Sequence, residues 1–203
     1  MRIRNKFPRV DSERHQYLLD NQWTLVKGPR GIPRSILLSI PLMFINAFIA
    51  FWIIKIFDGI SFEEFGISPG SMSFSINLVY ILGFVLILAI SHELMHLIFV
   101  PNFIKSKKTY IGLTYFGGYA YSEEIVTKIR YIIITIAPFF IISIILPILL
   151  SFFGLLTPFI KLIVLANAAS SSVDILTLIT ILIYVPSRAS LVMNGSKGYW
   201  KKL

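Results

Sequence analysis

Four apolar runs of membrane-spanning length constrain the fold of this chain more than any other feature. They extend from about Ile36 to Phe57, Phe74 to Val100, Tyr131 to Phe153 and Pro158 to Val185. About 20 apolar residues in an α-helix cross the hydrocarbon core of a bilayer. Of the 203 residues, 56% are hydrophobic and only 14% are charged, whereas a soluble domain of this size carries more charge. The sequence therefore predicts an all-α membrane protein with four transmembrane helices.

Prolines indicate where these helices end or bend. Proline cannot donate a backbone hydrogen bond, and its ring clashes with the preceding helical turn. We therefore expect Pro101 to end the second helix, and Pro138 and Pro147 to kink the third. Pro158 suits the first turn of the fourth helix, where no backbone donor is needed.

Basic residues lie in blocks between the apolar runs, and these blocks predict the orientation. They fill residues 1–34, the loop after the second run and the tail after Pro186, whereas the other two connections hold only Lys55 and Lys161. Cytoplasmic loops of membrane proteins are enriched in Lys and Arg. Both termini are therefore predicted to be cytoplasmic, with no cleavable signal peptide. The net charge of +9 then reflects membrane topology, and we expect no nucleic-acid partner.

The loop after the second run predicts a short cytoplasmic β-hairpin. Residues Thr109 to Tyr121 are rich in β-formers and are interrupted by Gly117 and Gly118, which suit a turn. Ser122, followed by two glutamates, predicts the start of a helix, because acidic residues favour the positive end of the helix dipole.

The second run contains HELMH, in which His92, Glu93 and His96 stand in a segment that should otherwise be apolar. Ionisable groups in a membrane span are costly and rare. On a helix, His92 and His96 lie one turn apart on the same face, where both imidazoles can reach one zinc ion. Glu93 then lies beside the activated water and can accept its proton. The pattern predicts a zinc-dependent peptidase, although two stray histidines on a plain helix could also produce it.

A catalytic zinc ion has a third protein ligand as well, and the chain has no cysteine to supply it. Asp174 is the only acid inside another apolar run, and it lies on a stripe of polar residues at helical spacing. That stripe comprises Asn167, Ser170, Ser171, Asp174 and Thr177. Asp174 could instead be a structural acid, and His15, Glu123 and Glu124 are the alternative ligands. Asn167 could bind the water or a substrate carbonyl, or it could only join helices by hydrogen bonds.

Three segments resemble a bacterial membrane family of zincin peptidases, the family called domain of unknown function 3267. These are SHELMHLIF, APFF at 137–140 and NAASSSVDI at 167–175, within a likeness that covers about 78–185. The resemblance implies zinc on His92 and His96, Glu93 as the catalytic base and Asp174 as the third ligand. The chain is more distantly similar to site-2 proteases, but these carry Asn-Pro-Asp-Gly where this chain has Ser-Val-Asp-Ile at 172–175.

We therefore expect three regions, namely a basic cytoplasmic segment at 1–34, a four-helix transmembrane metalloprotease-like domain at 35–186 and a basic cytoplasmic tail at 187–203. The predicted function is hydrolysis of peptide bonds in membrane proteins or membrane-associated peptides, in a bacterial cell membrane. The hairpin could present its edge to an extended substrate. One alternative is a non-enzymatic accessory or immunity-type membrane protein with a structural or vestigial metal site. Another is a metal transporter, which should show more ligands within its spans.

Overall fold

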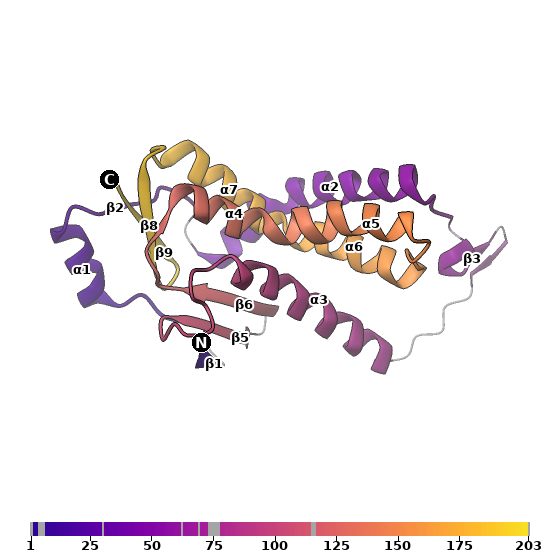
Figure 1. Ribbon diagram of the computed structural model, residues 1–203, viewed down its shortest axis with the longest axis horizontal. Helices are drawn as coiled ribbons and strands as arrows, with labels where there is room; N and C mark the ends of the chain where they lie inside the picture. The colour runs from indigo at the N-terminus through magenta and orange to yellow at the C-terminus, as the bar shows by residue number, and fades with distance from the viewer. Residues whose placement is uncertain are drawn as a thin grey trace. The chain divides into compact units, whose positions relative to one another are not determined.

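The computed structural model describes residues 2–3, 7–29, 31–61, 63–68, 70–72, 78–114 and 117–202. The chain, coloured from its N-terminus in indigo to its C-terminus in yellow in Figure 1, divides into two compact units. The first unit comprises Met1–Ser39, Glu93–Ala137 and Val173–Leu203, and the second comprises Ile40–His92 and Pro138–Ser172.

Within the described residues, four helical segments are long and apolar enough to cross a membrane, which agrees with the predicted number. The first span lies in α2 (Ile32–Phe57) and the second in α3 (Leu78–Ile98). The third joins α4 (Lys128–Pro138), the π-helix η2 (Phe139–Ile145) and α5 (Leu146–Phe152). The fourth joins α6 (Pro158–Ser170) and α7 (Ser172–Tyr184). The start predicted for the second run, at Phe74, lies outside the described residues.

The third and fourth spans are irregular, and the irregularities follow from particular residues. Between Pro138 and Pro147 the third span widens into the π-helix η2. A π-helix accommodates missing or displaced backbone hydrogen bonds, which proline imposes on a helix. In the fourth span, the hydroxyls of Ser170 and Ser171 both donate to the Asn167 carbonyl, Ser171 is the C-cap of α6, and α7 begins at the next residue.

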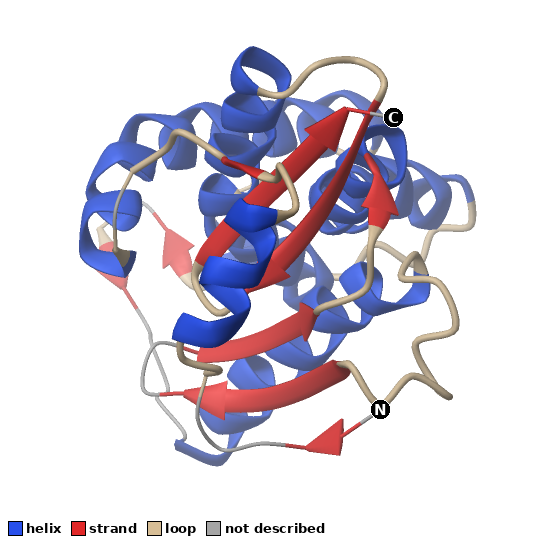
Figure 2. Ribbon diagram, turned by 90° about the vertical axis from the view of Figure 1, so that its left-hand side faces the viewer, coloured by secondary structure: helices blue, strands red, loops and turns tan. Residues whose placement is uncertain are grey.

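The first unit contains two small sheets, shown as red arrows in Figure 2. One sheet has the order β1 (Arg2–Ile3), β5 (Thr109–Thr114), β6 (Gly117–Ser122). The other has the order β2 (Thr24–Leu25), β9 (Lys197–Lys202), β8 (Ala189–Asn194), β7 (Val126–Thr127). Strands β5 and β6 pair antiparallel, in agreement with the predicted hairpin, while its cytoplasmic side stays a prediction. The helix predicted to start at Ser122 is wrong, because β6 ends there and α4 begins only at Lys128.

The fold is mostly helical but not all-α, because the C-terminal residues predicted only as a basic tail form the hairpin β8–β9. Its core residues are buried, with Leu191 and Tyr199 both 0% exposed. Gly195 forms the turn with φ +56°, and a Cβ there would lie 2.6 Å from the backbone nitrogen of Val10. Only glycine tolerates both conditions. The hairpin therefore belongs to the folded core of the first unit.

Part of the N-terminal segment packs on this hairpin. Helix α1 (Ser12–Asp20) is capped by Asp11, whose side chain accepts from the Arg14 N–H. The Asn194 amide exchanges two hydrogen bonds with the Asp11 backbone, at 3.0 and 2.8 Å. Leu18 packs in a buried cluster with Val192 and Tyr199 of the hairpin.

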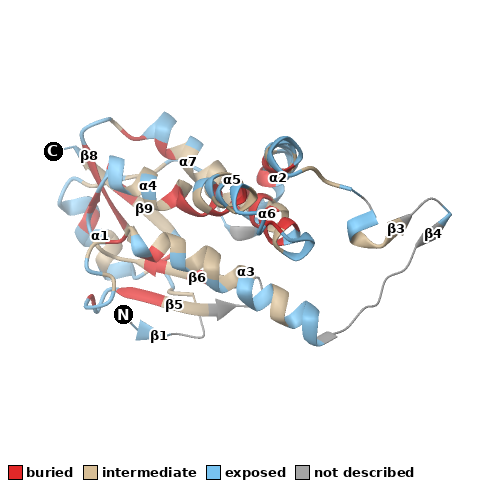
Figure 3. Cartoon of the chain, turned by 45° about the vertical axis from the view of Figure 1, so that its right-hand side comes forward, coloured by how far each residue is buried: buried red, intermediate tan, exposed pale blue. Residues whose placement is uncertain are grey.

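The second unit contains the short elements η1 (Glu63–Phe65), β3 (Ile67–Ser68) and β4 (Ser71–Met72) as well as helices. In Figure 3, α3 is coloured mostly as exposed or intermediate. Only 6% of its most apolar 18-residue window is buried. Large apolar side chains on it are exposed, for example Ile87 by half and Ile90 by more than half. An apolar helix with an exposed surface of this kind is suited to contact with lipid.

Candidate metal centre

Helix α3 carries all three residues of the HExxH motif. The helix is continuous from Leu78 to Ile98, so His92 and His96 lie one turn apart on one face, and Glu93 follows His92 directly. All three side chains are half-buried rather than fully exposed. The motif therefore lies on a helix, as its spacing predicts.

The imidazole of His96 is held by a backbone carbonyl. Its Nδ1–H donates to the Ile134 carbonyl oxygen over 2.7 Å. In a regular helix that carbonyl would accept the N–H of residue 138, but residue 138 is proline and has no N–H. Pro138 therefore leaves the Ile134 carbonyl available to His96. With the proton on Nδ1, the neutral imidazole carries its metal-binding lone pair on Nε2.

The imidazole of His92 is oriented by Asn167 in the same way. Its Nδ1 lies 3.0 Å from the Asn167 Oδ1. The Asn167 amide nitrogen donates to the Pro138 carbonyl at 2.9 Å and to the Ser143 hydroxyl at 2.8 Å. These two acceptors fix which end of the amide is the oxygen, so His92 donates from Nδ1, and in the neutral imidazole the lone pair is then on Nε2.

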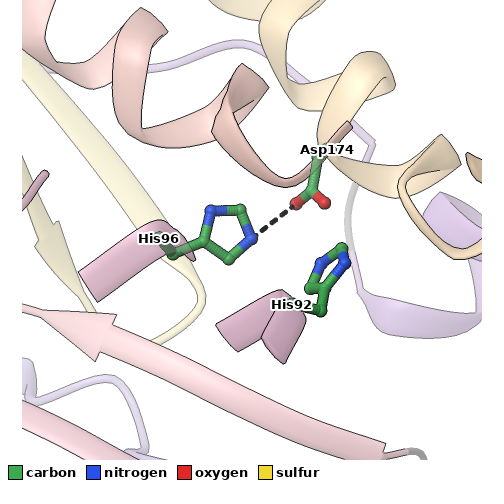
Figure 4. A group of neighbouring side chains, drawn as sticks. All are labelled: His92, His96 and Asp174. Carbon is green, nitrogen blue, oxygen red and sulfur yellow. Dashed lines mark ion pairs between the residues drawn. The ribbon is translucent and has the colours of Figure 1, made fainter. Parts of the chain in front are cut away.

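Asp174 lies in the first turn of α7. Its Oδ1 is 3.5 Å from the His96 Nε2, the contact drawn as a dashed line in Figure 4. Both side chains are largely buried, with 22% of Asp174 and 14% of His96 exposed. The Asp174 carboxylate therefore faces the nitrogen of His96 that is suited to bind a metal.

One ligand atom from each of His92, His96 and Asp174 lies within 4.8 Å of the other two (Figure 4). Two imidazole nitrogens and one carboxylate oxygen form a donor set of the kind found in catalytic zinc sites, which have three protein ligands. Imidazole and carboxylate together suit zinc, and both second-shell hydrogen bonds are of the type that orients zinc-bound histidines. The chemistry of these residues thus fits a zinc ion.

The alternative third ligands are engaged elsewhere. His15 lies on α1, with its Nδ1 2.6 Å from the Tyr199 hydroxyl. Glu123 pairs with Arg14. Glu124 accepts from the Ser106 hydroxyl at 2.6 Å. In the described part of the chain, no other cluster of three His, Asp or Glu side chains has the spacing of a metal site.

The polar stripe predicted on the fourth span is divided by the break at Ser171. Asn167 is 0% exposed, and its amide makes the hydrogen bonds described above. These bonds favour the alternative in which Asn167 joins helices and orients His92, while a contact with substrate stays a prediction. Ser170 is exposed and donates to the Asn167 carbonyl.

The first unit also contains a cavity of about 310 Å³ that is lined by His96 and Asp174. Tyr121 of β6, Tyr131 of α4 and Met193 of β8 contribute to its walls. Burial raises the pKa of Tyr121, so its phenol stays protonated and accepts the Gly195 N–H at 2.7 Å. Mostly apolar walls with a few polar groups are typical of binding cavities.

Sequence reasoning missed several residues that support the site. Ser143 is a single polar residue in an apolar run, and nothing in the sequence indicates that it contacts Asn167. The contact of His96 with Ile134 did leave a signal, because Pro138 stands four residues after Ile134. Tyr121 and Tyr131 read as ordinary aromatic residues of a hairpin and a span.

Comparisons with known proteins agree with this chemistry. A family model described as "Putative zincin peptidase" matches residues 85–190, just over half of the chain. The match includes the motif on α3 and Asp174 on α7. No curated protein and no solved structure matches the chain.

Proposed function

Since this chain belongs to the zincin peptidase family whose model it matches, we propose that it is a membrane-embedded zinc-dependent peptidase. The observation that carries the proposal is the donor set of His92, His96 and Asp174, with ligand atoms within 4.8 Å of one another. Glu93 follows the first of these ligands on α3, where a catalytic base is needed.

The side chains divide into ligands, a base and positioning groups. His92 and His96 would hold zinc through Nε2, and Asp174 through a carboxylate oxygen. Zinc, when bound, supplies Lewis-acid activation of the attacking water. Glu93 takes a proton from that water and delivers it to the nitrogen of the leaving amine. The Ile134 carbonyl and Asn167 keep both imidazoles in the tautomer that binds metal.

The substrate in this proposal is an extended segment of a membrane protein or of a membrane-associated peptide. Strand β6 is an edge of its sheet, because the strand order is β1-β5-β6. Residues Ala120 to Ser122 of β6 line the same cavity as His96 and Asp174. An extended backbone can pair with an edge strand, and its side chains then alternate between the sheet's two faces. The proposed orientation, with both termini in the cytoplasm, follows from the basic blocks.

The test compares wild-type protein with Glu93→Gln, in the full chain, in a bacterial membrane. An amide cannot accept the water's proton, so we expect cleavage to fall by about 100- to 10,000-fold while zinc remains near one per chain. Membrane proteins that accumulate uncut in the variant strain identify the substrate. Glu63→Gln, which changes an exposed glutamate of η1, is the matched control and should cleave like wild type.

Two results would contradict the proposal. One is wild-type protein that contains no zinc after gentle purification. The other is a Glu93→Gln variant that leaves the membrane proteome unchanged while zinc is bound, which favours the accessory protein with a structural metal site.

A further inference from the structure

Another cavity of the first unit carries positive charge in its walls. Its volume is about 520 Å³, and its walls include Lys27, Arg34, Leu38, Thr180 and Tyr184. Among the described residues that line it, none is Asp or Glu. The two cations therefore face a shared space with no carboxylate in its walls.

The position of the cavity along the spans places it at a membrane–water boundary. Arg34 is the second residue of the first span, Pro33–Phe57, and Tyr184 is the last residue of the fourth, Pro158–Tyr184. The start of the first of four spans and the end of the fourth lie on the same side of a membrane. Basic and aromatic side chains at span ends occupy the level of the lipid headgroups.

The walls change from charged to uncharged along the two helices. Leu38 lies one helical turn deeper than Arg34 on the same face of α2, and Thr180 lies one turn deeper than Tyr184 on α7. Leu38 is 49% exposed and Tyr184 is 48% exposed, although both are apolar or aromatic. The cavity thus has a cationic outer layer and an inner layer that an acyl chain can contact.

The loop that carries Lys27 is packed closely against α7. A Cβ on Gly28 would lie 3.1 Å from the Thr180 methyl carbon, so glycine allows this close approach. The approach fixes the backbone beside Lys27 against the wall of the cavity. Lys27 is itself exposed, but it lines the cavity from a loop whose backbone lies against α7.

We propose that this cavity, here called the interfacial pocket and defined by Lys27, Arg34, Leu38, Thr180 and Tyr184, binds the phosphate of an anionic glycerophospholipid. The planar guanidinium of Arg34 matches two phosphate oxygens, and the ammonium of Lys27 supplies a second, point-like cation. Basic pockets between transmembrane helices are suited to such headgroups. This proposal does not depend on zinc or on peptidase activity.

The experiment measures lipid retained by the full-length protein in native mass spectrometry, from micelles that contain phosphatidylglycerol. Compared with wild type, Lys27→Gln/Arg34→Gln should bind phosphatidylglycerol about tenfold to thirtyfold more weakly, since each basic residue near the surface contributes up to about fivefold in affinity. Lys107→Gln/Lys108→Gln removes the same charge from an exposed turn and should bind like wild type. Arg34→Lys keeps the charge but loses the planar guanidinium, so its affinity for phosphatidylglycerol should fall by only a few fold.

Competing ligands separate a lipid from a free anion. Phosphatidylcholine, which has the same phosphate but no net charge, should be retained less than phosphatidylglycerol. Inorganic phosphate should displace the lipid poorly, because it cannot contact the inner layer of the pocket. Equal retention by the Lys27→Gln/Arg34→Gln variant, an equal loss in the Lys107→Gln/Lys108→Gln control, or efficient displacement by inorganic phosphate would each overturn the proposal. Circular dichroism checks that every variant is folded like wild type.

Discussion

Two clusters of ionisable side chains involve the apolar helices of this protein, and they differ in the kind of groups that they bring together. Lys161 on α6 is 3% exposed, and its ammonium contacts Asp58 at 2.8 Å, Glu64 at 2.7 Å and the Gly59 carbonyl at 3.0 Å. Three donors thus meet three acceptors, which matches the capacity of an ammonium group. The lysine cluster needs nothing from outside the chain.

The cluster of His92, His96 and Asp174 consists instead of two imidazoles and one carboxylate, which are groups that can bind a cation. The Nδ1 atom of each imidazole contacts a fixed acceptor, and one ligand atom of each imidazole and of the carboxylate lies within 4.8 Å of the other two. The lysine cluster is thus complete as a structural clamp, whereas the donor set of the histidine cluster is suited to a metal ion.

The largest expected difference between the clusters is in zinc binding. Asp174→Asn replaces a carboxylate by a much poorer ligand, so we expect zinc affinity to fall by more than about 100-fold, beyond the range for second-shell changes. Lys161→Met removes a buried charge of the other cluster and should keep one zinc per chain. Chelator competition on the purified protein measures both.

This test also decides which residue is the third ligand. If Asp174→Asn keeps full zinc while His15→Ala or Glu123→Gln loses it, the assignment of Asp174 is wrong. The metal would then lie among the loops and α1, and the membrane-embedded part of the proposed function would fail.

A smaller effect is expected from the group that orients His92. Asn167→Ala removes the acceptor for the His92 Nδ1–H, and loss of a second-shell partner weakens zinc binding by about 10- to 100-fold. Ser170→Ala is the control, because its hydroxyl contacts only the carbonyl of Asn167 and not the amide. Equal zinc affinity in both variants would show that Asn167 does not position the ligand.

The sequence was enough to single out the motif and Asp174 as candidates, because ionisable groups are conspicuous in apolar runs, while their role as zinc ligands stays a prediction. It was insufficient for the supporting contacts, since backbone carbonyls have no sequence signature of their own. The contact between His96 and the Ile134 carbonyl is the exception, because Pro138 removes the competing donor. The Asn167 contacts with Ser143 and Pro138 depend on how α6 meets the π-helix, which spacing alone does not specify.

The four helical spans could be predicted because length and hydropathy decide them. The hairpin β8–β9 was missed because its charged residues, such as Lys197 and Lys201, suggested a cytoplasmic tail. Its turn signal was nevertheless present as Asn194-Gly195 between β-forming residues. The packing of α1 on that hairpin depends on contacts between the two ends of the chain, which no local pattern indicates.

The lysine cluster predicts a stability effect rather than a metal effect. Lys161→Met leaves Asp58 and Glu64 without their shared cation, at a cost of about 2 kcal/mol. For a chain of this size that corresponds to a melting temperature lower by about 4–8 °C. Lys55→Met is the control, since the Lys55 ammonium lies over the Trp52 ring in an exposed position and contributes less. A Lys161→Met protein that melts like wild type would mean that the cluster is not a clamp.

The smallest expected effect is the pH dependence contributed by Glu64. The hydrogen bond from the Lys161 ammonium, and then the one from the Ser61 N–H, lower the pKa of Glu64 below its ordinary value of 4.5. A lowered pKa in the folded state stabilises the fold above the ordinary value, and this stabilisation is lost as the pH falls through the lowered value. Wild-type protein should therefore lose melting temperature more steeply below pH 4.5 than Glu64→Gln, by about 2 °C. Glu63→Gln, which changes the neighbouring exposed carboxyl, should follow the wild-type curve, and a Glu64→Gln curve parallel to wild type would exclude this contribution.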